Sequence, residues 1–372
     1  MALSSSRNHY RRRVQQQVPA DDRSRLFAAI IPAIVAACFP FSGTVLAHEG
    51  WGIVVDLQGQ IYFSDIPTNT IWRINREGKL ESFISDKHSH ALVLGEDGSI
   101  YGTQEHHSAA TGSVWRIAPD GSFSDVFTPA FDFPLNLHPF IIDRDGNIYS
   151  TNSISFPNQR DKATLLKCTP GGVVTTLAGS TRGYRDGRGS EAQFSGIDGM
   201  AWASDGSLYV TDGVYVRRVT TDGVVTTLGN GALTSPSYGE DLMGLALSPS
   251  GDVFVADYSQ RRLLRLMPDG HTRTVVETGL IWSPTGITLV GEDLYLLEHL
   301  RMPLVLFGDI GVGAYARVRK LSPDGRVVTI ATVWGRNTIP FALVLVAIGA
   351  LSIFTWRFRR RRKARRPSRT AA

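Results

Sequence analysis

The sequence predicts an all-β protein: a six-bladed β-propeller of four-stranded antiparallel blades, with an N-terminal signal segment and a C-terminal transmembrane helix. A sixteen-residue unit recurs six times, always with a basic residue at its fourth position and glycine at its ninth. A second strand-turn-strand pattern precedes every copy. Four short strands repeated in this way form blades that close into a ring, which leaves few free sheet edges. The six units are 70–85, 113–128, 164–179, 215–230, 262–277 and 317–332.

Each unit is predicted to form a β-hairpin, because β-branched and apolar residues flank a polar turn whose glycine permits positive φ. The turn is Pro-Asp-Gly at 119–121, 268–270 and 323–325. The preceding hairpin supplies two more strands, an apolar inner strand and a second strand. The second strands are predicted at 61–65, 100–104, 148–152, 208–212, 253–257 and 294–298.

The N-terminal end, residues 1–47, is predicted to be a signal peptide. An apolar run at 26–47 follows an arginine-bearing stretch, and Val45 and Ala47 suit a signal-peptidase site at its end. Two alternatives remain open, an uncleaved signal anchor and lipoprotein-type processing at Cys38.

The C-terminal end is predicted to cross a membrane once. Residues 337–356 include nineteen consecutive uncharged residues, which at ~1.5 Å per residue span a hydrocarbon core. The tail, 357–372, is strongly basic, and such a cluster marks the cytoplasmic side. We therefore expect a single-pass membrane protein with its propeller, residues 48–336, on the extracytoplasmic side.

The charge distribution limits the classes of partner that we expect, and the cysteine content predicts the state of Cys168. Residues 48–336 hold 24 Lys and Arg against 32 Asp and Glu, so the net charge of +5 arises only at the two ends. An acidic folded domain argues against nucleic acid, and we expect the membrane and an unknown protein or small-molecule ligand as partners. Cys168 is the only cysteine after the leader and takes an apolar strand position, so it is predicted to be buried and free.

Strand direction gathers histidines and acids at one face. We call this face the top, because inner strands begin there and second strands end there. Both hairpin turns of each blade lie at the bottom. The catalytic candidates at the top are His88, His90, His106, Glu298 and His299. Converging imidazoles and carboxylates suit general acid–base chemistry or a divalent metal. The alternatives are that these histidines are ordinary loop residues and that the polar second-strand ends tie neighbouring blades together.

Residues 178–229 resemble the NHL-repeat family. A Gly-Tyr-x-Asp-Gly-x-Gly segment at 183–189 is followed by an apolar inner strand, by Leu-Tyr-Val-Thr-Asp at 208–212 and by Val-Thr-Thr-Leu at 225–228. The remainder of 48–333 is similar in a looser way. This resemblance implies a six-bladed propeller of four-stranded blades.

The chain also resembles the senescence-marker-protein/gluconolactonase group of metal-dependent lactone hydrolases, which carries an early Glu-Gly like Glu49-Gly50. In that group the glutamate is a metal ligand. The resemblance implies a divalent metal, calcium or zinc, and the metal-ligand candidates here are Glu49, His138 and Asp198. A further family ligand, an aspartate, falls on Met243, whose thioether does not suit a hard cation.

Two functions are therefore in view. The first is a ligand- or protein-recognition module, because propellers of this type often serve as interaction platforms and Met243 removes one family ligand. The alternative is a metal-dependent hydrolase of a lactone or ester, similar to gluconolactonase, with its site at the propeller mouth.

Overall fold

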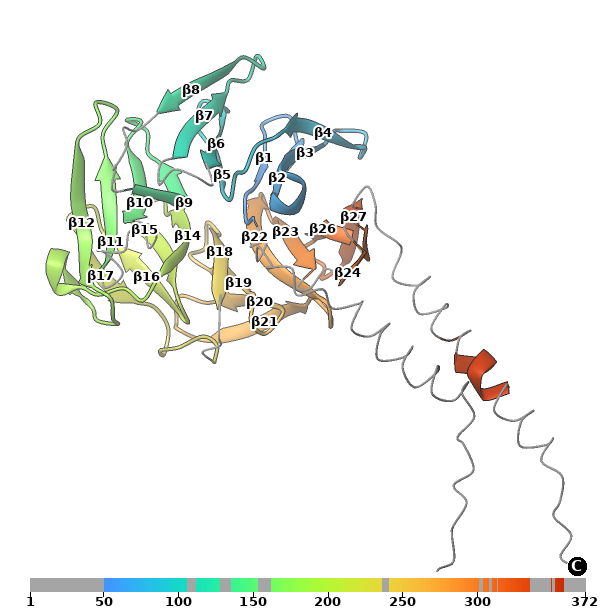
Figure 1. Ribbon diagram of the computed structural model, residues 1–372. Helices are drawn as coiled ribbons and strands as arrows, with labels where there is room; N and C mark the ends of the chain where they lie inside the picture. Colours follow the sequence, from blue (N-terminus) through green and yellow to red (C-terminus); the bar gives the residue numbers. More distant parts are fainter. Residues whose placement is uncertain are drawn as a thin grey trace, which may run out of the picture. The chain divides into compact units, whose positions relative to one another are not determined.

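The computed structural model describes residues 50–105, 112–127, 135–152, 162–235, 241–300, 304–307, 310–312, 314–334, 349 and 352–357. Within them the chain forms six antiparallel sheets arranged as a propeller (Figure 1). Each sheet has four strands in chain order from the inside outward, and blade four gains a fifth, short strand at its outer edge. The predicted six-bladed propeller of four-stranded antiparallel blades is confirmed.

The first three blades follow one another along the chain. Blade one contains β1 (Ile53–Val55), β2 (Ile61–Asp65), β3 (Thr70–Ile74) and β4 (Leu80–Ser85), with the 3-10 helix η1 (Ile66–Thr68) after β2. Blade two contains β5 (Leu92–Leu94), β6 (Ile100–Glu105), β7 (Gly112–Ile117) and β8 (Phe123–Phe127). Blade three contains β9 (Leu135–Ile142), β10 (Ile148–Asn152), β11 (Lys162–Cys168) and β12 (Val174–Thr181).

The last three blades complete the ring. Blade four contains β14 (Ile197–Trp202), β15 (Leu208–Asp212), β16 (Tyr215–Val219) and β17 (Val224–Thr227), and its added strand is β13 (Gly187–Arg188), followed by the 3-10 helix η3 (Gly189–Glu191). Blade five contains β18 (Leu242–Leu247), β19 (Val253–Asp257), β20 (Arg262–Leu266) and β21 (Thr272–Glu277). Blade six contains β22 (Trp282–Val290), β23 (Asp293–Leu300), β26 (Ala314–Leu321) and β27 (Val327–Trp334), with the small hairpin β24 (Leu304–Phe307) and β25 (Ile310–Val312) between β23 and β26.

The ring closes between blades six and one. Each inner strand contacts the inner strand of the next blade, and β22 contacts β1. Some of these contacts are too close for a side chain. A Cβ atom on Gly286 would lie 2.1 Å from the carbonyl oxygen of Trp51, and one on Gly199 would lie 2.4 Å from that of Met243. Glycine at these inner positions therefore sets how tightly the blades approach.

The hydrophobic core is divided among the blade interfaces. Among the described residues, buried apolar side chains form six clusters, and each cluster joins two neighbouring blades. This follows from the alternation of side chains along a strand, which sends successive apolar residues to the two faces of a blade. Cys168 is fully buried in the cluster between blades two and three, as predicted, and burial raises the pKa of its thiol.

The repeated basic residue and glycine have structural roles at the bottom. The ninth-position glycines all have positive φ, between 77° and 85°. The fourth-position cations pair with carboxylates, in five blades with the acid beside the turn between the inner and second strands and in blade one with an outer-strand glutamate. These pairs are Arg73–Glu81, Arg116–Asp97, Lys167–Asp143, Arg218–Asp205, Arg265–Asp252 and Lys320–Asp293.

The predicted signal peptide, 1–47, and basic tail beyond residue 357 lie outside the described residues, as does most of the predicted membrane helix, 337–356. Of that segment, residues 349 and 352–356 are described and are helical. In the described part of the chain, no helix has both the length and the apolar character needed to cross a bilayer.

Candidate functional site

The structure brings two of the predicted catalytic residues together at the top of the propeller. His88 and His90 lie in the segment that leads from β4 into β5, and both are buried. Their Nε2 atoms are 3.1 Å apart, and their rings meet edge to face with centroids 4.9 Å apart. The ring of Trp51, just before β1, lies 5.3 Å from the ring of His90. We call these three rings the top-rim cluster.

Backbone contacts hold this cluster between blades one and two. The carbonyl oxygen of His90 accepts from the backbone N–H groups of Trp51 and Gly52, at 2.8 and 2.9 Å. Ser64, near the end of β2, donates its hydroxyl to the same carbonyl at 3.4 Å. The start of β5 is therefore fixed against blade one, and the imidazole of His90 is fixed with it.

Asn69 determines how the two imidazoles share their protons. Its side-chain Oδ1 lies 3.0 Å from Nδ1 of His88. Because a carbonyl oxygen can only accept, Nδ1 of His88 carries a proton and its Nε2 is an acceptor. Nε2 of His90 must then donate to it, which leaves Nδ1 of His90 as the basic nitrogen of the pair. Asn69 has a left-handed backbone, φ 48°, at the end of η1, a conformation that asparagine tolerates well.

Glu298, another predicted catalytic residue, lies in a buried ion pair. Its side chain is fully buried, and its two oxygens accept from Arg317 and Arg319, which are on the neighbouring strand β26. The Nε of Arg319 lies 2.8 Å from Oε1 of Glu298. Arg317 also donates to the carbonyl oxygen of Thr278, in the segment that arrives from blade five. These contacts give Glu298 a structural role between blades five and six.

Three consecutive blades share this arrangement, which we call the acid–arginine clamp. In each, the carboxylate that ends the second strand binds an arginine of the third strand. That arginine also donates to a carbonyl of the segment from the preceding blade. The members are Asp212, Arg217 and the carbonyls of Arg185 and Gln193 in blade four; Asp257, Arg262 and Leu233 in blade five; and Glu298, Arg317 and Thr278 in blade six. The interpretation of these strand ends as ties between blades is confirmed here.

His299 faces away from Glu298, because successive residues of a strand point to opposite faces. It is fully buried between blades six and one, where its Nδ1 lies 3.0 Å from the hydroxyl of Thr285. Its Nε2 lies 3.9 Å from Oδ1 of Asp65, the acid that ends β2, and neither atom has a hydrogen-bond partner in the described structure. Burial lowers the pKa of His299 to about 3 and raises that of Asp65 to about 6.

Blade one lacks the arginine of the clamp. The positions that hold arginine in blades four to six are Thr70 and Trp72 in blade one. Asp65 therefore accepts from the hydroxyl of Thr68 at 2.5 Å and meets His299 on its other side. Alignment of the six units shows this missing arginine in the sequence. Sequence reasoning did not, however, propose Asp65, Asn69 or Trp51 as site residues.

The metal-ligand set implied by the resemblance receives no support from the described residues. Asp198 is half-buried near the start of β14, whereas Glu49 and the side chain of His138 lie outside the described residues, as does His106. Met243 is fully buried in the cluster between blades five and six, so its thioether serves the core. No group of three or more His, Cys, Asp or Glu side chains suited to a metal occurs in the part of the chain that is described. Of the three predicted ligands only Asp198 has a described side chain, so the predicted donor set stays a prediction.

Comparison with known proteins defines the class. The model of the SMP-30/gluconolactonase/LRE-like region matches residues 50–297, which is more than half of the chain. The protein therefore belongs to this family of six-bladed propellers.

The individual proteins that this chain resembles have low sequence identity to it. Teneurin-m of Drosophila melanogaster is 28% identical over 282 residues, which covers 65% of this chain but only 10% of Teneurin-m. Virginiamycin B lyase from Staphylococcus aureus is 16% identical with a TM-score of 0.46, covering 77% of this chain and 85% of the lyase. A gluconolactonase from Xanthomonas campestris is 14% identical with a TM-score of 0.48, covering 67% and 84%.

Proposed function

We propose that this protein hydrolyses a small lactone or ester at the top of its propeller, with His90 as general base and His88 as its positioning partner. Membership of the SMP-30/gluconolactonase/LRE-like family supports this reaction class. The observation that carries the choice of site is the His88–His90 pair, whose Nε2 atoms lie 3.1 Å apart beside Trp51.

The chemistry follows from the proton arrangement of the pair. Nδ1 of His90 is buried, so the reaction requires water and the substrate carbonyl to enter beside the His90 ring. Nδ1 then takes a proton from that water, and the water oxygen bonds to the carbonyl carbon of the substrate. The ester C–O bond then breaks, and the same proton passes to the leaving alkoxide, which yields a hydroxy acid from a lactone. His88 accepts a hydrogen bond from Nε2–H of His90 throughout, and this bond strengthens when His90 is cationic. Asn69 holds His88 in the tautomer that this relay needs.

The test is lactone turnover by the full-length protein. Purified protein is assayed against aliphatic and sugar lactones by pH-stat titration. His90→Gln is expected to lower kcat by about 10²–10⁴-fold, the usual contribution of a general base. Asn69→Ala removes the acceptor that fixes the tautomer and is expected to give a smaller loss of kcat with little change in KM.

His271→Gln is the matched control, because His271 is an exposed histidine in the bottom hairpin of blade five. It should leave turnover unchanged. The absence of turnover on every lactone, or full activity in His90→Gln, would contradict the proposed hydrolysis.

A recognition module is the second candidate, and burial of Met243 favours it. With a thioether in the core at a family ligand position, a metal-dependent reaction loses one of its donors. Metal analysis of the purified protein separates the two. Calcium or zinc that is retained, and lost on Glu49→Ala and Asp198→Ala, supports the metal-dependent enzyme. A metal-free protein that is inert on lactones supports recognition of a ligand or protein.

The proposed location is the outer side of a membrane, anchored by 337–356. The uncharged stretch in this range and the basic tail that follows it support this topology. Protease treatment of intact cells should remove the propeller and leave the tail protected. Protection of the propeller instead would exclude the proposed orientation.

A further inference from the structure

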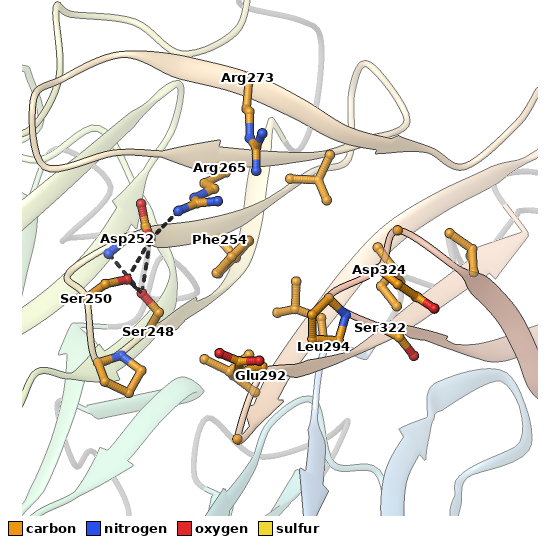
Figure 2. Close-up of a pocket in the computed structure, with 18 of the residues that line it drawn as sticks. Ser248, Ser250, Asp252, Phe254, Arg265, Arg273, Glu292, Leu294, Ser322 and Asp324 are labelled. Carbon is orange, nitrogen blue, oxygen red and sulfur yellow. Dashed lines mark hydrogen bonds and ion pairs between the residues drawn. The ribbon is translucent and has the colours of Figure 1, made fainter.

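A groove on the bottom face lies between blades five and six, away from the top-rim cluster. It has a volume of about 830 Å³, within the range of ligand sites of roughly 300–1,000 Å³. Buried apolar side chains line it, among them Phe254, Leu294 and Leu321. Figure 2 shows Arg265 and Arg273 at one side of this groove. The groove therefore offers an apolar surface beside two cations.

The two arginines are direct cross-strand partners. Arg265 lies on β20 and Arg273 on β21, and the two residues are paired in register. Like charges directly opposite each other in a sheet are destabilising. Asp252 pairs with Arg265 at 2.7 Å, so one of the two charges is compensated. Arg273 is exposed and has no ion-pair partner in the described structure.

This pairing occurs in blade five only. In every blade the fourth-position cation has one cross-strand partner on the outer strand, and elsewhere that partner is acidic, hydroxylic or apolar. The six pairs are Arg73 with Glu81, Arg116 with Ser124, Lys167 with Thr175, Arg218 with Thr226, Arg265 with Arg273 and Lys320 with Val328. The scaffold accepts other residues at this position, so the fold itself does not require Arg273.

Arg265 has hydrogen-bonding capacity to spare. Its Nη2 binds Asp252, but its buried Nε has no hydrogen-bond partner in the described part of the chain. That Nε is enclosed by protein, so a ligand in the groove would meet the Nη atoms of Arg265 and the exposed guanidinium of Arg273. An oxyanion bound between the two guanidinium groups would relieve their charge repulsion.

We propose that this groove binds a small organic acid, with its carboxylate at Arg265 and Arg273 and its apolar body against Phe254, Leu294 and Leu321. Arginine presents paired donors that match a carboxylate. Glu292 and Asp324 lie across the groove from the arginines (Figure 2). These acids repel a carboxylate there, so the head group is directed to the blade-five side.

A second bottom groove provides an internal comparison. It lies among the turns of blades two, three and four and has a volume of about 880 Å³. Its charged lining has five acids and one arginine, against three acids and two arginines in the first groove, and its arginine, Arg144, is paired with Glu96. The acids that line it are Glu96, Asp97, Asp143, Asp145 and Asp205. The two grooves have similar volumes, but this one should reject an organic acid.

The test uses 2-naphthoate as the probe and 2-naphthamide as its neutral analogue. Each is titrated calorimetrically into the full-length protein, with a detergent blank. Saturable binding of naphthoate that is at least tenfold tighter than binding of naphthamide is expected. Binding should weaken as salt is added, because the interaction is ionic.

Two variants of Arg273 locate the site. Arg273→Gln is expected to weaken naphthoate binding about tenfold or more, with naphthamide unaffected. Arg273→Glu places an acid opposite Arg265, as Glu81 stands opposite Arg73 in blade one, and is expected to abolish binding while raising Tm. The rise in Tm excludes misfolding as the cause. Arg144→Gln, in the acidic groove, is the matched control and should bind naphthoate like the native protein.

Three outcomes overturn the proposal. These are no saturable binding of naphthoate to the native protein, equal affinity for naphthoate and naphthamide, and unchanged naphthoate affinity in Arg273→Gln. Loss of binding in Arg144→Gln with retention in Arg273→Gln would assign the probe to the other groove and overturn it as well.

Discussion

Replacing Arg217 with methionine is expected to destabilise blade four far more than replacing its neighbour, Arg218. The side chain of Arg217 is fully buried, and it binds Asp212 at 2.7 Å and Asp186 at 2.8 Å. It also donates to the carbonyl oxygen of Arg185 at 2.9 Å. All of these contacts are lost in Arg217→Met, although the apolar volume is largely kept.

The expected loss in the free energy of unfolding follows from the carboxylate of Asp212, which stays buried when its cation is removed. Asp212 is fully buried, and without Arg217 its charge has no cation in contact. It keeps the hydrogen bonds from the backbone of Ser195 and Gly196, at 2.6 and 2.9 Å, which limit the damage. Breaking a buried pair by removing one partner costs about 3–5 kcal/mol, and we expect a loss in this range.

Arg218 provides the matched comparison on the same strand. It pairs with Asp205 at the same 2.7 Å, but its side chain is 35% exposed and that of Asp205 is 51% exposed. Water screens this pair, so Arg218→Met should cost about 0–1 kcal/mol. A further variant, Arg217→Met with Asp212→Asn, removes the stranded charge and should recover part of the loss.

Urea unfolding followed by tryptophan fluorescence measures these differences from the midpoints and a common slope. The full-length protein is used for all variants. If Arg217→Met and Arg218→Met differ by less than about 1 kcal/mol, or if Asp212→Asn recovers nothing, the clamp does not stabilise blade four as described.

Two further perturbations test the junction between blades six and one. Between about pH 4 and 6, Asp65 keeps a proton in the folded protein that it has lost in the unfolded chain. Its contribution to the free energy of unfolding therefore falls by ~1.4 kcal/mol for each pH unit of increase. His299 lacks a proton in the folded protein that it holds in the unfolded chain, so its contribution rises by the same amount. The difference in free energy of unfolding between variant and native protein should therefore rise with pH in Asp65→Asn and fall with pH in His299→Gln. It is measured by urea unfolding at each pH, and a difference that does not change with pH would contradict the assignment. Gly286→Ala should cost about 1–3 kcal/mol in the same assay, because its Cβ meets the Trp51 carbonyl, whereas Gly196→Ala, with open space around it, should cost little.

Local sequence patterns predicted the blades well because the signals are local. The second strand of blade four was predicted at 208–212 and occupies those residues. The glycine of each hairpin turn has the positive φ that its turn type requires. Burial of Cys168 followed from its place in the apolar position of the repeat. These features depend on residues a few positions apart, whose preferences survive in any blade.

The candidate site was predicted only in part. Strand direction identified the face on which His88 and His90 meet, since both precede the same inner strand. It named Glu298 and His299 together as catalytic candidates, although strand alternation sends them to opposite faces, and only the tertiary structure shows what each face meets. The partner of His299 is Asp65, more than two hundred residues away in the sequence. Ring closure makes these two residues neighbours.

The sequence by itself determined the number of blades, their strands and turns, and which residues share a face. This was possible because the same short pattern of strand and turn residues occurs six times, and each copy predicts the same local structure. The tertiary structure decided the partners: which acid receives an arginine, which histidines meet, and where two arginines stand opposite each other beside a groove. These pairings depend on contacts between blades and on the register across strands. Both are set by residues far apart in the chain, so local sequence patterns do not predict them.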